Sequence, residues 1–221
     1  MKKIILSLAV LTGFASAANA QTGVKYGIKG GFNGATFSGT DSKGSEYKAG
    51  FAAGVFANFG ITDQVSIQPE VLFSQKGASI DDFQGTSGTT FKSTLSYIDV
   101  PILARINTGQ DGKGLFFEIG PQGSLAVSNR DFIQTGGNKY NENTKTQDLN
   151  KVMIGYVGGI GYQITSGLSL GVRYTGDFSQ VYKDGQSATL KATPTGNFLA
   201  NNPSVHNSVF QFQVGYAFGG K

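Results

Sequence analysis

The fold is decided by the stretch His206-Asn-Ser-Val-Phe-Gln-Phe-Gln-Val-Gly-Tyr-Ala-Phe218, in which apolar residues alternate with polar or small ones. Successive side chains of a β-strand point to opposite faces. One face of this strand therefore carries aromatic side chains and a valine, and the other carries Gln211 and Gln213 with glycine and alanine. A soluble barrel would turn the apolar face inward, whereas a barrel in an outer membrane would turn it toward lipid.

The same alternation recurs along the chain and predicts eight strands. Each has about ten residues or slightly more, which is the length that a tilted strand needs to cross a bilayer. The predicted strands are Tyr26–Phe37, Gly50–Gly60, Val65–Gly77, Leu95–Ile106, Gly114–Val127, Lys151–Ile164, Leu168–Phe178 and His206–Phe218. In Val152–Gln163 both faces are apolar or glycine, so the sequence leaves the inward face of that strand open.

The connections between these strands alternate between long and short. The short ones are rich in turn-forming residues: Ile61–Gln64, Asn107–Lys113 and Thr165–Gly167. The long ones are polar: Ser38–Ala49, Ala78–Thr94, Ser128–Asn150 and Ser179–Val205. Outer-membrane barrels have short periplasmic turns and longer outer loops. The sequence therefore predicts an all-β fold, an eight-stranded antiparallel up-and-down transmembrane β-barrel that closes by pairing its first and last strands.

Charged side chains occur in the middle of several predicted strands, on the face opposite the aliphatic residues. They are Glu70, Asp99, Arg105, Glu118 and Arg173. An eight-stranded barrel has an interior just wide enough for side chains to fill, and buried charges there must be paired. We therefore predict a charge cluster in the lumen that stabilises the barrel, with Glu70, Glu118 and Arg173 at similar depths. The alternative role for this cluster is a gate in a narrow pore.

The N-terminus has the pattern of a secretory signal peptide. Two lysines precede the mostly apolar stretch Ile4–Ala18, and small residues then surround the predicted cleavage site between Ala20 and Gln21. The apolar stretch is shorter than the ~20 residues that a membrane-spanning helix needs. We expect residues 1–20 to be removed on export and residues 21–221 to form one barrel domain.

Composition argues against several other classes of protein. The chain has no cysteine, and its 18 basic and 14 acidic residues are too evenly balanced to mark a nucleic-acid surface. His206 is the only histidine, and no acid–base set converges on it by sequence. The glycine-rich segments open no helix that could hold a phosphate, and the loop acids lack calcium-loop spacing. We therefore expect no enzyme activity, no cofactor and no metal.

Several segments together cover most of the chain after residue 20 and resemble a known family. They are Tyr26-Gly-Ile-Lys-Gly-Gly-Phe-Asn33, Gly54-Val-Phe-Ala-Asn-Phe-Gly60, Ile67-Gln-Pro-Glu-Val-Leu-Phe-Ser-Gln-Lys-Gly77, Tyr97-Ile-Asp-Val-Pro-Ile-Leu-Ala-Arg105, Gly158-Gly-Ile-Gly-Tyr162 and Leu170-Gly-Val-Arg-Tyr174. They resemble the PorT-like outer-membrane β-barrel proteins of Bacteroidota, often described as a porin family. The resemblance implies an eight-stranded barrel in the outer membrane of a Gram-negative cell. One departure is that Gly219-Gly-Lys221 follows Phe218, whereas many such barrels end on the aromatic residue that the barrel-assembly machinery recognises.

The long connections are the segments in which we expect specific contacts. Ser128–Asn150 and Ser179–Val205 are rich in polar residues with isolated aromatics, and binding residues are often placed on loops that a rigid scaffold holds. The leading hypothesis is a non-enzymatic barrel in outer-membrane lipid that contacts a protein or surface ligand through these loops. The alternatives are a narrow pore for small solutes and a soluble periplasmic, lipocalin-like ligand carrier, which would be an inverted barrel.

Overall fold

Strands make up nearly all of the regular structure. The computed structural model describes residues 24–40, 42, 44–82, 86–109, 113–144, 146–147, 149–183 and 204–218. The strands are β1 (Lys25–Ser38), β2 (Ser45–Glu46), β3 (Lys48–Gly60), β4 (Val65–Ile80), β5 (Thr89–Asn107), β6 (Gly114–Thr135), β7 (Asn138–Asn143), β8 (Val152–Gln163), β9 (Leu168–Asp177) and β10 (His206–Phe218). The predicted cleavage site, Ala20 and Gln21, lies outside the described residues. Within the described ranges, no helix is long and apolar enough to span a membrane.

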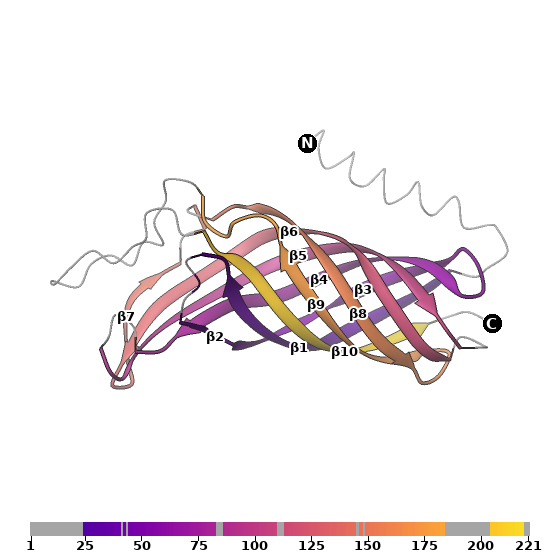
Figure 1. Cartoon of the computed structure of the whole chain (residues 1–221), viewed down its shortest axis with the longest axis horizontal. Coiled ribbons are helices and arrows are strands. Elements are labelled where there is room, and N and C mark those ends of the chain that lie inside the picture. Colours follow the sequence, from indigo (N-terminus) through magenta and orange to yellow (C-terminus); the bar gives the residue numbers. More distant parts are fainter. Residues whose placement is uncertain are drawn as a thin grey trace.

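Eight of these strands close into a ring in the order β4-β3-β1-β10-β9-β8-β6-β5, and β5 pairs back with β4. All neighbours are antiparallel, and the ring closes between the first and last strands, with Tyr26 opposite Phe218 and Phe32 opposite Phe212. The two short strands lie outside the ring, β2 on the edge of β4 and β7 on the edge of β6 (Figure 1). The predicted eight-stranded up-and-down barrel is confirmed, and β2 and β7 are additions that the sequence did not reveal.

Two of the short turns use the same local chemistry. The Thr62 hydroxyl accepts a hydrogen bond from the Val65 amide at 3.0 Å, and the Thr165 hydroxyl accepts one from the Leu168 amide at 2.9 Å. A backbone bond closes each turn from the residue before the threonine, Ile61 N to Val65 O and Ile164 N to Leu168 O, both at 2.8 Å. Threonine thus satisfies the backbone of a tight reversal at the short-turn end of the barrel.

Strands β5 and β6 are much longer than predicted, and for β6 a β-bulge explains why. Their pairing shifts where Ser96 and Tyr97 of β5 face the Ala126–Ser128 segment of β6. Along β6 the outward positions are odd-numbered up to Val127 and even-numbered from Ser128 onward, and among the latter only Phe132 is buried, beneath Arg130 and Lys139. The extra residue reverses the parity of the strand and keeps its inner face turned inward. A search for strict alternation therefore ends β6 at Val127, although the strand continues to Thr135.

The inward and outward faces match the predicted assignment. The predicted inward face of β10 is buried at Gln211 and Gln213, which expose 1% and 7% of their surface. Strand β8, left open by the sequence, turns Met153 and Val157 inward and Val152 and Ile154 outward. Half of its inward positions are glycine and two are Met153 and Val157, so alternation of hydropathy could not distinguish its two sides.

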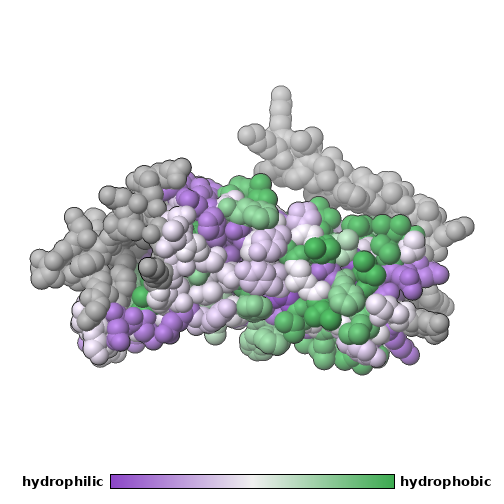
Figure 2. Space-filling view, viewed as in Figure 1, coloured by the Kyte–Doolittle hydropathy of each residue, from purple (hydrophilic) through white to green (hydrophobic). Residues whose placement is uncertain are grey.

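Large apolar side chains cover the outside of the barrel at the end that carries the short turns. Figure 2 shows them over the right half of the molecule, while the surface over the other end is mostly polar. They include Ile28, Phe32, Val55, Ile102, Ile119, Ile160, Phe212 and Val214, which are all exposed. A water-soluble barrel would bury its apolar side chains, so the inverted arrangement of a lipocalin-like carrier does not fit this structure.

Candidate functional site

The five charged residues predicted for the lumen all point into it and are nearly inaccessible. The exposed fraction is 1% for Glu70 and Asp99, 2% for Arg173, and 5% for Arg105 and Glu118. Strands β4, β5, β6 and β9 supply them, because each residue falls on the polar face of its strand. The placement inside the barrel was therefore readable from alternation alone, whereas their mutual contacts were not.

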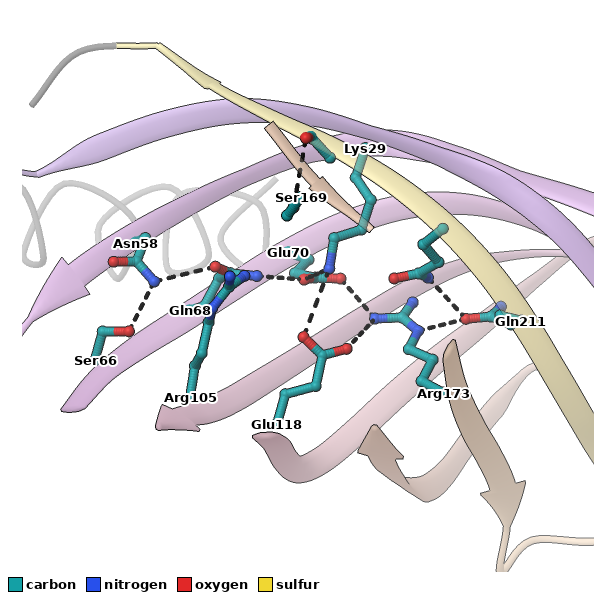
Figure 3. A network of polar contacts seen from close by, with 12 residues as sticks. Lys29, Asn58, Ser66, Gln68, Glu70, Arg105, Glu118, Ser169, Arg173 and Gln211 are labelled. Atoms are coloured by element: carbon teal, nitrogen blue, oxygen red, sulfur yellow. Dashed lines mark hydrogen bonds and ion pairs between the residues drawn. The ribbon is translucent and has the colours of Figure 1, made fainter. Parts of the chain in front are cut away.

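Three of the five meet at the centre of the lumen (Figure 3). Arg173 Nη1 lies 2.8 Å from Glu70 Oε2 and 3.9 Å from Glu118 Oε1. Lys29 from β1 lies on the other side of the same carboxylates, 2.5 Å from Glu70 Oε1 and 3.9 Å from Glu118 Oε2. The central cluster, defined here as Lys29, Glu70, Glu118 and Arg173, has two cations and two carboxylates, and it brings together the three residues for which a similar depth was predicted.

Lys29 is the member that the sequence analysis missed. It lies on β1, where Ile28 and Phe32 mark the lipid-facing side. A residue one position from Ile28 must face the lumen, so the same alternation would have identified it.

Amide side chains and a glycine hold the central cluster in place. Arg173 Nε donates to Gln211 Oε1 of β10, and Gln68 Nε2 donates to Glu70 Oε1 at 2.8 Å. At Gly159 of β8, a Cβ would lie 2.7 Å from Arg173 Cβ and 3.0 Å from Glu118 Cγ. The absence of a side chain there gives the two charged residues room to approach each other.

Asp99 and Arg105 lie apart from the central cluster. Asp99 pairs with Lys76 of β4 at 3.0 Å, and the Lys76 ammonium sits over the Tyr97 ring at 4.8 Å. The Arg105 guanidinium stacks on Phe116 with 3.5 Å to the ring centroid and donates to Gln163 Oε1 at 2.6 Å. The expectation of a single cluster therefore holds for three of its five residues. Lys76 was not predicted, because it lies near the end of the predicted strand.

An apolar cluster fills the interior at the end opposite the short turns. Its members are Phe37, Ala78, Leu95, Tyr97, Ala126, Leu149, Met153, Val181, Tyr182 and Val205. Four of these come from connecting segments, namely Leu149, Val181, Tyr182 and Val205. An isolated bridge joins Leu149 to Tyr182, and a 2.8 Å backbone bond runs from Val181 N to Val205 O. We call these ten residues the outer core. Beside it, Asn207 Nδ2 donates to Asp177 Oδ2 at 2.9 Å and to the Tyr97 hydroxyl at 3.3 Å.

Nothing in the described part of the chain forms a metal centre or a histidine-based catalytic set. No group of three or more metal-ligating His, Cys, Asp or Glu side chains occurs there. His206 Nδ1 lies 3.1 Å from the Ser179 carbonyl oxygen, a contact that joins β10 to the segment after β9.

A family model described as the outer membrane protein beta-barrel domain matches residues 18–183. The chain belongs to this family. That membership fits the barrel, its polar lumen and its apolar exterior, and it gives the outer membrane as the place of the protein. No curated protein matches the chain significantly.

Several solved structures are similar to this chain at low sequence identity. Neisserial surface protein A has 16% identity and a TM-score of 0.48, with 89% of this chain and 99% of that one covered. Ail, the attachment invasion locus protein of Yersinia pestis, has 11% identity and a TM-score of 0.44, with 88% and 98% covered. OprG from Pseudomonas aeruginosa has 13% identity and a TM-score of 0.41, with 90% and 97% covered.

Proposed function

We propose that this chain is a non-enzymatic integral protein of the outer membrane that acts through the sheet it raises above the lipid. The raised part, called the outer extension here, consists of Thr89–Ser96 of β5, Ser128–Thr135 of β6 and strand β7. In this role the membrane-spanning part is a closed scaffold. The outer extension and the segments beside it contact a protein or surface ligand.

The observation that carries this proposal is the change of surface along β5 and β6. Toward the short turns their outward side chains are apolar, among them Ile102, Ile106, Leu115 and Ile119. Beyond the bulge the exposed outward side chains are polar: Lys92 and Thr94 on β5, and Arg130 and Gln134 on β6. The strands have 19 and 22 residues, well beyond the ~10 that a tilted strand needs to cross a bilayer. Strand length in excess of the lipid thickness is available for contacts in water.

The lumen favours a closed scaffold over the alternative of a narrow pore. Ion pairs from β1, β4, β6 and β9 cross its centre, and the outer core fills one end. An eight-stranded barrel leaves little space beyond its own side chains. Conduction would require these pairs to separate inside a medium of low dielectric constant, which costs several kcal/mol.

Cysteine labelling in intact cells tests the orientation, because the natural chain has no cysteine. A membrane-impermeant maleimide is expected to label Lys139→Cys of β7 in intact cells, and to label Thr62→Cys of a short turn only after the outer membrane is opened. The same samples, run unheated on a gel, should migrate as a folded, heat-modifiable barrel from the membrane fraction. Labelling with the opposite sidedness, or recovery in the soluble periplasm, would refute the proposal.

Planar-bilayer recording separates the scaffold from the pore. The wild-type barrel is expected to give no unitary currents, since the ion pairs and the outer core obstruct the lumen. Steady currents through the wild-type barrel, together with larger currents through Arg173→Ala, would instead show a gated pore. That result would refute the proposal that the barrel is a closed scaffold.

Export and lineage form the remaining part of the proposal. The lysine, apolar and small-residue pattern supports a signal peptide over residues 1–20 with cleavage between Ala20 and Gln21. The segments Tyr26–Asn33 and Tyr97–Arg105 support kinship with the PorT-like barrels of Bacteroidota, hence a Gram-negative cell whose barrel-assembly machinery inserts the protein. An intact mass that begins at Gln21 tests the cleavage site, and a mass that retains residues 1–20 contradicts it.

A further inference from the structure

Arg105 lies at the base of a recess that opens at the short-turn end of the barrel, which is the periplasmic end. The recess has a volume of about 50 Å³ and is lined by Lys25, Phe56, Asn58, Gln68, Arg105, Asn107, Gln163, Ser166, Gly167, Ser169 and Ala217. A volume of this size holds about four waters or one small oxyanion. We call it the periplasmic recess.

The charges near this recess do not balance. In the lumen from the central cluster to the short turns, the buried cations are Lys29, Arg105 and Arg173, and the buried carboxylates are Glu70 and Glu118. Three positive and two negative charges leave an excess of one positive charge. Glu70 contacts Lys29 and Arg173 closely, and Glu118 lies 3.9 Å from each of them, so Arg105 is the one of these three cations that forms no ion pair.

The direct contacts of the Arg105 guanidinium are all with neutral groups, while the carboxylates of Glu118 and Glu70 act on its charge from beyond ion-pair distance. Its Cα is opposite that of Glu118 across the β5–β6 ladder, yet the Glu118 carboxylate turns away toward Arg173 and Lys29. In Figure 3 no ion pair joins Arg105 to either carboxylate, and its head lies on the Asn58 and Ser66 side of the cluster. The guanidinium stacks on the Phe116 ring and donates hydrogen bonds to Gln163 Oε1 at 2.6 Å and to Asn107 Oδ1 at 3.4 Å. These contacts orient the guanidinium without supplying a negative charge.

The lining of the recess complements an anion. None of the lining residues is acidic, and Lys25 adds a second cation at the rim. Gln163 is fixed by donating to Thr165 O at 2.8 Å and Leu168 O at 3.1 Å, so its oxygen faces Arg105 and its nitrogen faces the turn. The stacked guanidinium is thus rigid, with its remaining N–H donors available for one more acceptor.

We propose that the periplasmic recess binds a small oxyanion, a phosphate or carboxylate group, through Arg105 and Lys25. The planar fork of arginine matches the geometry of such groups, and a charge-assisted bond in a buried site is stronger than a neutral one. The ligand enters from the periplasm, because the central cluster and the outer core separate the recess from the outer end. Binding in the recess does not depend on the outer extension, whereas entry from the periplasm rests on the orientation proposed above.

The test is an NMR titration of the refolded full-length barrel in detergent with inorganic phosphate, at ionic strength held constant with sodium chloride. Saturable shifts are expected at the Arg105 Nε–H and at the side-chain amide of Gln163, with no comparable shift at Gln122 higher in the lumen. Arg105→Gln should weaken binding by about tenfold or more, the size of one charge-assisted bond. No saturable shift in the wild type would overturn the proposal.

Two further variants keep the test decisive if Arg105→Gln does not fold. Lys25→Gln changes only the rim and should weaken phosphate binding by a smaller factor. Lys151→Gln removes an exposed cation that precedes β8 at the other end and should leave the affinity unchanged. Equal weakening by Lys151→Gln and Lys25→Gln would show general attraction to a cationic protein and would refute a site in the recess.

Discussion

The part of the barrel within the lipid and the outer extension are one continuous sheet with opposite polarity. Within the lipid, Ile119 and Phe212 face outward while Glu70 and Arg173 are buried. Beyond the bulge, Phe91 and Ile133 are buried against each other and Leu95 joins the outer core, while the outward face is polar. The same strands thus carry an apolar exterior over one stretch and an apolar interior over the next.

The difference shows that the surrounding solvent decides which face of a strand is apolar. Lipid replaces water outside the lower part, so the interior there can hold paired charges and amides. The outer extension stands in water and must bury its own apolar side chains in order to be stable. The bulge beside Tyr97 lies at the boundary between these two stretches.

Removing Arg173 should produce the largest effect, because it breaks the centre of the lipid-embedded half. Arg173→Ala leaves Glu70 and Glu118 to share Lys29, and breaking a buried pair costs about 3–5 kcal/mol of unfolding free energy. Urea unfolding in lipid vesicles measures this loss. The double variant Arg173→Ala with Glu70→Ala should lose less than the sum of the two single losses. A loss below about 1 kcal/mol, as for an exposed pair, would show that the cluster is solvated.

Leu149→Ala tests the outer core. Leu149 is fully buried, so the substitution should cost about 2–5 kcal/mol through lost burial and the cavity that remains. Thr94→Ala, on the outward face of β5, is the matched control and should change stability by no more than about 0.5 kcal/mol. Unfolding by urea compares the two, and equal small effects would mean that the outer core does not contribute to folding.

A single arginine placed on either half locates the boundary between lipid and water. Ile119→Arg on the exposed apolar face should cost about 2–4 kcal/mol, as a cation does near the bilayer midplane. Thr94→Arg in the outer extension should be nearly neutral, within about 0.5 kcal/mol. Both are read from unfolding in vesicles. A comparable cost at Thr94 would place lipid around the extension and erase the distinction between the halves.

Much of the barrel was predictable because lipid imposes a simple rule on each strand. The alternation in His206–Phe218 and the mid-strand positions of Glu118 and Arg173 were sufficient to assign inside and outside. Alternation did not assign the faces of β8, because its two faces do not differ in polarity. It also failed in β6 after Val127, where the outward positions change from odd-numbered to even-numbered residues. The pairing of Asp99 with Lys76, and the isolation of Arg105, depended on side-chain reach across neighbouring strands, which no single-strand pattern contains.

By itself the sequence determined the eight strands, the facing of all of them except β8, and the closing contact between β1 and the final alternating stretch, because a period of two is a local property of the chain. Only the tertiary structure decided which buried charges meet, that connecting segments seal one end with Leu149 and Val181, and that Arg105 remains without a carboxylate partner. The physical reason is that closure of the ring brings residues of unpaired strands together across the lumen, as when β4 and β9 place Glu70 beside Arg173. The sequence supplies the charges, and the closed ring sets the distances between them.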